Sequence, residues 1–205
     1  YVHIPFCESV CYYCACNKVV TRHHERAAEY LDAIELEIAL HEAELGERTA
    51  ASQLHLGGGT PTFLSNDELT RLMGMLRRAF ALTPTAELSI EVDPRTVDAG
   101  RLAHLAELGF NRLSFGVQDV DPKVQQAVHR VQTSASIGAL LESARALNFR
   151  STNVDLIYGL PLQTGASFAR TVAQINEWRP DRIALYAYAH LPERFKPQQI
   201  GRAHV

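Results

Sequence analysis

Residues 1–14 read YVHIPFCESVCYYC and place a short apolar segment, Tyr1–Phe6, directly before a loop of closely spaced cysteines. An apolar segment of this length, bounded by small or polar residues, is typical of a buried strand. The same pattern recurs at Gln53–Leu56, Leu88–Val92, Arg112–Val117, Asn153–Ile157 and Ile183–Tyr188. Each of these segments is predicted to be a strand.

Stretches of helical periodicity lie between the predicted strands. Ser65 and Glu68 form a capping box before one of them, and Asp98 is a suitable cap for the next. Such alternation predicts parallel strands joined by right-handed crossovers. Because six units are too few to close an eight-stranded barrel, we expect an α/β fold, a partial (β/α)6 barrel with parallel strands. Functional residues should then lie where strands end and helices begin.

Composition sets limits on the class of protein. The chain has 205 residues, 46% hydrophobic and 21% charged, which is ordinary for one globular domain. A net charge of −3 supplies no basic field, so neither a nucleic acid nor a membrane is predicted as a partner. Without an apolar run long enough to cross a bilayer or an N-terminal leader, the expected location is cytoplasmic. We expect a monomer.

All four cysteines fall between positions 7 and 16, where they could staple only one short loop and not a disulfide framework. Cys7, Cys11 and Cys14 have the spacing C-x3-C-x2-C, which suits three irons of a [4Fe-4S] cluster and leaves the fourth iron open. Two alternatives are a structural zinc site with Cys16 as the fourth ligand, and buried thiols without a ligand.

A glycine-rich segment, Gly57-Gly58-Gly59-Thr60-Pro61, follows the second predicted strand. Glycine lets the backbone approach a small ligand closely, although glycines after strands are often only turns. No Gly-Lys-Ser/Thr follows, so this is not a phosphate-binding P-loop. A cysteine loop after the first strand and this motif after the second are in the order found in radical S-adenosylmethionine (SAM) enzymes, which the chain resembles.

Further motifs narrow the resemblance. YVHIPFC, LHLGGGTPT, SIEVDP, FNRLSFGVQD, STNVDLIYGLP and YAYAHLP are similar to those of the oxygen-independent coproporphyrinogen III oxidase family. The resemblance implies oxidative decarboxylation of two propionates of coproporphyrinogen III to vinyl groups, which gives protoporphyrinogen IX in haem biosynthesis. It also implies a [4Fe-4S] cluster, two SAM molecules and an electron donor that the sequence does not identify.

The resemblance also assigns residues. Cys7, Cys11 and Cys14 match the cluster ligands, and we expect that Cys16 is not a ligand. Positions matching contacts to the cluster-bound SAM are Tyr1, Gly58 and Glu91. Positions matching contacts to the second SAM are Tyr13, Gly59, Thr60, Gln118, Arg130, Asp155 and Ala189. Arg130 could equally be a solvated side chain.

A haem-binding relative of these enzymes is the rival interpretation. Its pattern lacks the fourth cysteine and has a histidine two places after the arginine that matches Arg130; here Cys16 is present and Gln132 fills that position, which favours the oxidase. We expect residues 1–198 to form the radical SAM core, truncated at both ends. Residues 199–205 back-translate to a sequencing-adapter sequence and are expected to be a non-native tail. Such a fragment should bind SAM without converting coproporphyrinogen III.

Overall fold

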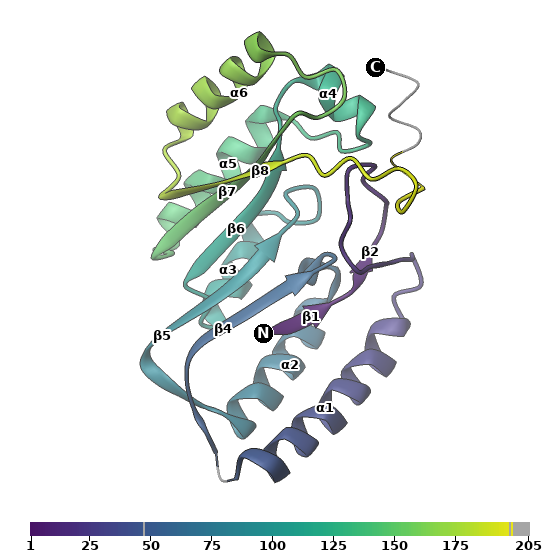
Figure 1. Cartoon of the computed structure of the whole chain (residues 1–205). Helices are drawn as coiled ribbons and strands as arrows, with labels where there is room; N and C mark the ends of the chain where they lie inside the picture. The colour runs from purple at the N-terminus through teal and green to yellow at the C-terminus, as the bar shows by residue number, and fades with distance from the viewer. Residues whose placement is uncertain (47, 197, 199–205) are drawn as a thin grey trace.

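The computed structural model describes residues 1–46, 48–196 and 198. Its centre is a six-stranded sheet in the order β1-β4-β5-β6-β7-β8, and every neighbouring pair is parallel (Figure 1). The strands are β1 (Val2–Ile4), β4 (Ala50–Gly58), β5 (Ala81–Val92), β6 (Arg112–Gln118), β7 (Ser151–Tyr158) and β8 (Arg182–Ala187). The strands of this sheet follow one another in space in the same order as in the chain, and β1 and β8 form its two open edges. The sheet is curved but not closed (Figure 1), and the predicted partial (β/α)6 barrel is confirmed.

Helices connect the strands and cover one face of the sheet (Figure 1). They are α1 (Arg26–Leu45), α2 (Asn66–Ala79), α3 (Ala99–Glu107), α4 (Pro122–Ala127), α5 (Ser134–Ala146) and α6 (Gly165–Trp178), with a 3-10 turn η1 at Pro61–Phe63. The expected capping box is present, because the Ser65 side chain accepts from the Glu68 amide and Glu68 accepts from the Ser65 amide. Asp98 caps α3 as expected.

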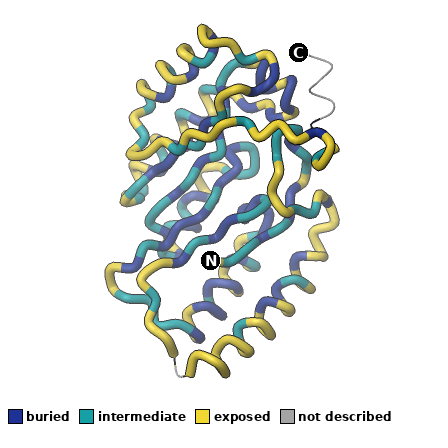
Figure 2. Tube along the Cα trace, viewed as in Figure 1, coloured by how far each residue is buried: buried dark blue, intermediate teal, exposed yellow. Residues whose placement is uncertain are grey.

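Alternation along each strand decides which side of the sheet carries the core. In β5, Ile90 and Val92 are buried against the helices, whereas Glu91 between them lines the open side. In β7, Val154 and Leu156 belong to the same core, and Asp155 between them lines the open side. Successive side chains point to opposite faces, so along these strands the helical side is apolar and the inner side polar. The central strands are largely buried or half-buried (Figure 2).

Two features differ from the sequence expectations. The first apolar segment is split into β1 and β2 (Phe6–Cys7), and β2 pairs in parallel with a short β3 (Val19–Val20) that was not predicted. The spacing of Phe168, Val172 and Ile175 in the sequence predicts that Val172 faces the core, but on α6 Val172 is exposed and the neighbouring Thr171 is buried. Thr171 turns inward because its hydroxyl donates to Asp119 at 2.7 Å.

Within the described part of the chain, no helix is both long and apolar enough to cross a membrane. The expected tail, residues 199–205, lies outside the described residues. The division into a core and a tail therefore stays a prediction.

Candidate functional site

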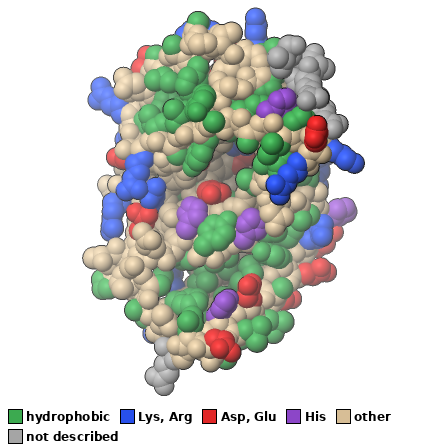
Figure 3. Space-filling model, viewed as in Figure 1, with side chains coloured by type: hydrophobic (Ala, Val, Ile, Leu, Met, Phe, Trp, Pro, Cys, Tyr) green, Lys and Arg blue, Asp and Glu red, His purple; other side chains and the backbone are tan. Residues whose placement is uncertain are grey.

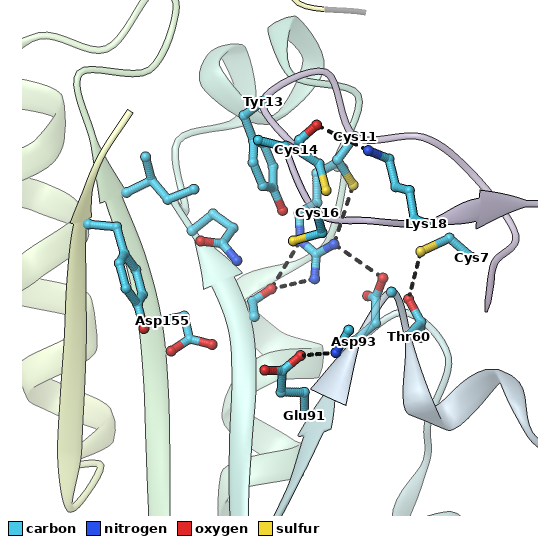
Figure 4. Close-up of a pocket in the computed structure, with 18 of the residues that line it drawn as sticks. Cys7, Cys11, Tyr13, Cys14, Cys16, Lys18, Thr60, Glu91, Asp93 and Asp155 are labelled. Carbon is cyan, nitrogen blue, oxygen red and sulfur yellow. Dashed lines mark hydrogen bonds and ion pairs between the residues drawn. The ribbon is translucent and has the colours of Figure 1, made fainter. Parts of the chain in front are cut away.

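A pocket of about 350 Å³ lies at the carboxyl ends of the strands. Its lining includes every residue that the sequence assigned to cluster or SAM except Tyr1. In Figure 4, the cysteine loop lies over the ends of the strands that carry Glu91 and Asp155. The sequence therefore selected positions that the fold gathers from the cysteine loop, β4, β5, β6, β7 and the segment after β8.

Tyr1 lies outside this pocket. Its ring stacks on His55 with 5.8 Å between centroids, and its hydroxyl forms a 3.0 Å hydrogen bond with His3. It lines a different cavity, beside β1. Its expected contact with SAM stays a prediction.

Backbone hydrogen bonds hold the cysteine loop over the pocket. The Thr21 amide donates to the Cys7 carbonyl at 2.9 Å, and the Tyr12 amide donates to the Val128 carbonyl at 2.9 Å. Within the loop, the Cys14 amide donates to the Cys11 carbonyl, and Lys18 Nζ donates to the Cys14 carbonyl at 3.1 Å. The β2–β3 pair thus closes the loop at its base and fixes where the sulfurs lie.

The four thiols have different surroundings. A 3.4 Å hydrogen bond joins Cys7 Sγ to Thr60 Oγ1, and burial raises the pKa of Cys7. The hydrogen bond with the Cys16 thiol lowers the pKa of Cys14 to about 6, and the same bond raises the pKa of Cys16. Cys14 is therefore the more easily ionised partner of this pair, and ionised thiols are the metal-binding form.

Among the described residues, no three Cys, His, Asp or Glu side chains are grouped closely enough to hold one metal ion. Cluster ligands bind different irons and need not converge on one point, so three cysteines around one pocket suit a cluster better.

The glycine segment packs β1 against β4. The Gly59 amide donates to the Ile4 carbonyl and the Thr60 amide to the Phe6 carbonyl, both at 2.8 Å. A Cβ at Gly59 would lie 2.5 Å from the Pro5 carbonyl oxygen, so this position has no room for a side chain. Gly58 has φ +119°, which favours glycine, and its amide donates to Glu91 at 3.1 Å. These contacts place the motif at the edge of the pocket.

Two carboxylates lie on the inner side of the sheet. Glu91 accepts from Gly58, and its other oxygen is 3.3 Å from His55 Nε2. Asp155 accepts from Asn153 at 2.7 Å and from Ser114 at 3.1 Å. Burial raises the pKa of Asp155. In the space-filling view, histidine and acidic side chains gather across the middle of this face (Figure 3).

Arg130 is buried and is not a solvated side chain. It follows α4, and its Nε donates to the Gly116 carbonyl at 3.0 Å while Nη1 reaches Asp93 at 3.2 Å. Beside it, Gln118 ends β6 with φ +69°, and its Oε1 is buried without a hydrogen-bond partner. A buried, unpaired amide oxygen is unfavourable, so this atom suits a donor on a bound ligand.

Arg95 is one of the lining residues that sequence reasoning did not assign to this site. Arg95 follows the end of β5, lines the pocket, and donates to Cys11 Sγ at 3.5 Å. The only sequence signal was a charged residue just after a strand end. Its contact with a cysteine 84 positions away depends on the folded chain.

Comparison with known proteins agrees with this geometry. Residues 1–175 match the family model of the radical SAM superfamily, and the chain belongs to that superfamily. The family implies a [4Fe-4S] cluster and SAM as cofactors, and the cysteine loop and the pocket fit both.

Within the superfamily, the chain is similar to oxygen-independent coproporphyrinogen III oxidases. It is 53% identical to the enzyme of Escherichia coli strain K12 over 199 residues, which is 97% of this chain and 43% of the relative. Identity to the Pseudomonas aeruginosa enzyme is 51% over 201 residues, which is 97% of this chain and 44% of the relative. The chain thus spans less than half the length of these curated relatives.

Solved structures give the same relationship. The structure of coproporphyrinogen III oxidase from Escherichia coli, described as a radical SAM enzyme, superposes with a TM-score of 0.93 and 52% identity. That match covers 97% of this chain and 45% of the solved chain. A structure of native anSMEcpe with bound AdoMet is 13% identical with a TM-score of 0.59 and shows the shared fold alone.

Proposed function

We propose that Cys7, Cys11 and Cys14 bind a [4Fe-4S] cluster and that the pocket beneath binds SAM. The supporting observation is that one pocket at the strand ends gathers the cysteine loop, the glycine segment and two inner-face carboxylates. When bound, the cluster supplies the electron that cleaves SAM reductively.

The residues of the chain bind and orient the cofactors. Glu91 and Asp155 supply oxygens suited to the amine or the ribose hydroxyls of SAM. Gln118 Oε1 offers an unused acceptor to the same ligand. Gly58 and Gly59 keep the pocket edge free of side chains. Tyr13, Thr60, Arg130 and Ala189 complete the lining, and the assignment of individual residues to a first or second SAM belongs to this proposal.

We propose further that the protein to which this sequence belongs is an oxygen-independent coproporphyrinogen III oxidase. The similarity to enzymes of that name over 97% of the chain supports this substrate. The proposal includes an electron donor of unspecified identity, a monomeric state and a cytoplasmic location.

Metal content tests the cluster. After anaerobic reconstitution, the chain should contain about four irons and about four sulfides. The variant Cys16→Ser should keep both, whereas Cys7→Ser, Cys11→Ser and Cys14→Ser should each lose most of the cluster. Zinc without labile sulfide in the wild-type chain would contradict the proposal. A cluster lost in Cys16→Ser and kept in Cys7→Ser would reverse the ligand assignment.

Product analysis tests the reaction. The reduced protein is incubated with SAM and coproporphyrinogen III, and 5′-deoxyadenosine and protoporphyrinogen IX are measured separately. We expect 5′-deoxyadenosine from this chain, and protoporphyrinogen IX from the gene product that contains it. SAM cleavage without any protoporphyrinogen IX from that product would refute the substrate and leave the cofactor proposal standing.

A further inference from the structure

A group of charged side chains surrounds Cys11 in the lining of this pocket. Asp93 directly follows β5, and the exposed fraction of its side chain is only 6%. It pairs with two guanidiniums, Arg95 Nη2 at 2.7 Å and Arg130 Nη1 at 3.2 Å. Burial opposes ionisation, but these two cations hold the pKa of Asp93 below its ordinary value.

Both guanidiniums also reach the same sulfur. Arg130 Nη1 donates to Cys11 Sγ at 3.4 Å, and Arg95 Nη2 donates to it at 3.5 Å. Hydrogen bonds to sulfur are longer than those to oxygen, so both distances fit. A cation withdrawn from water needs a compensating anion, and Asp93 supplies one to both guanidiniums.

The backbone fixes the direction of Arg95. The Arg95 amide donates to Asp93 Oδ1 at 3.0 Å, which closes a tight turn at the end of the strand. The guanidinium then returns to the same carboxylate through Nε at 3.0 Å and Nη2 at 2.7 Å. This two-point pairing sets the plane of the guanidinium and leaves Nη2 facing Cys11.

Two guanidiniums and one carboxylate leave this group with one net positive charge, and both guanidiniums donate to the Cys11 sulfur. Donors to a ligand sulfur stabilise the more negative, reduced state of a cluster.

We propose that Arg95, held by Asp93, is a positioning residue that donates a hydrogen bond to the Cys11 sulfur and makes the bound cluster easier to reduce. The inference rests on the proposed cluster site. Arg130 also donates to this sulfur, but it is assigned a contact with SAM as well. Arg95 has no such assignment, so its variants test the effect on the reduction potential of the cluster.

The test compares reconstituted Arg95→Gln and Arg95→Lys with Arg71→Gln. Arg71 pairs with Asp32 and Glu35 on the outer surface of α1 and α2, so its variant makes the same charge change away from the pocket. Iron and sulfide content, the EPR spectrum of the reduced cluster and its midpoint potential are measured for each.

We expect Arg95→Gln to keep its iron and sulfide but to have a more negative midpoint potential and an altered EPR spectrum. Arg95→Lys, which keeps the charge without the two-point pairing, should lie between it and the wild type, and Arg71→Gln should match the wild type. An unchanged potential in a fully loaded Arg95→Gln would overturn the proposal. Failure of both Arg95 variants to load, with Arg71→Gln loaded, would also overturn it, because Arg95 would then be needed for structure. Wild-type protein without sulfide would instead refute the cluster itself.

Discussion

At the scale of single residues, the inner-face carboxylates show the limit of a sequence motif. The motif gives the position of a side chain, but not the burial and hydrogen bonds that set its pKa. The resemblance assigned Asp155 to the site, and in the structure it lies between two core residues of β7 and lines the pocket. Its surroundings could not be predicted, since Ser114, which donates to it, is 41 positions away on β6. The motif located the residue, whereas its environment depends on the register of neighbouring strands.

The variant Asp155→Asn should reveal this environment through pH. Because burial raises the pKa of Asp155 in the folded chain, the wild type loses stability as pH rises from the ordinary carboxyl pKa, about 3.9, through the raised value. The asparagine cannot ionise, so the stability of the variant relative to the wild type should increase across that window and then level off. Urea unfolding of the cluster-free chain from about pH 4 to about pH 7 measures it. A difference that stays constant over the range would contradict the raised pKa.

At the scale of elements, long strands and capped helices were readable from sequence and short pairings were not. The capping box at Ser65 and Glu68 was predicted because its signal lies within four consecutive residues. The two-residue strands β2 and β3 escaped, since two residues show no periodicity and the cysteine loop separates the partners. The contact of Arg95 with Cys11 escaped because the two residues lie 84 positions apart on different segments.

Packing at the junction of β1 and β4 gives a prediction for the glycine segment. Gly59→Ala would place a Cβ 2.5 Å from the Pro5 carbonyl oxygen, and backbone on both sides leaves little room to adjust. We expect a loss of about 1–3 kcal/mol in the free energy of unfolding. Gly165→Ala is the matched control, because a Cβ there meets nothing within 4 Å at the start of α6. It should be neutral or stabilise by up to about 1 kcal/mol. The thermal unfolding midpoints of the two cluster-free variants are compared. Equal midpoints would show that Gly59 is not packed as described.

At the scale of the whole molecule, the curved sheet has two unlike edges. β1 is three residues long, whereas β8 spans six and, within the part of the chain that the structure describes, pairs with β7 alone. Ile183, Leu185 and Tyr186 on β8 are each more than half exposed. A long, apolar edge strand offers unpaired backbone groups to another chain. We therefore expect this chain, studied alone, to self-associate through β8, whereas the monomeric state is proposed for the protein to which this sequence belongs.

Placing a charge on that edge should reduce the association. Ile183→Lys adds a cation to an exposed position, and a charge on an edge strand opposes pairing with a second strand. We expect a lower weight-average mass in light scattering at equal protein concentration, with an unchanged thermal midpoint. The control is Val172→Lys, also at an exposed apolar position but on α6, where the backbone is hydrogen-bonded within the helix. Both variants change the net charge from −3 to −2, so they differ only in where the charge lies. An equal decrease in mass for both would assign the effect to net charge or to general apolar contact, and no decrease for Ile183→Lys would exclude β8 as the associating edge.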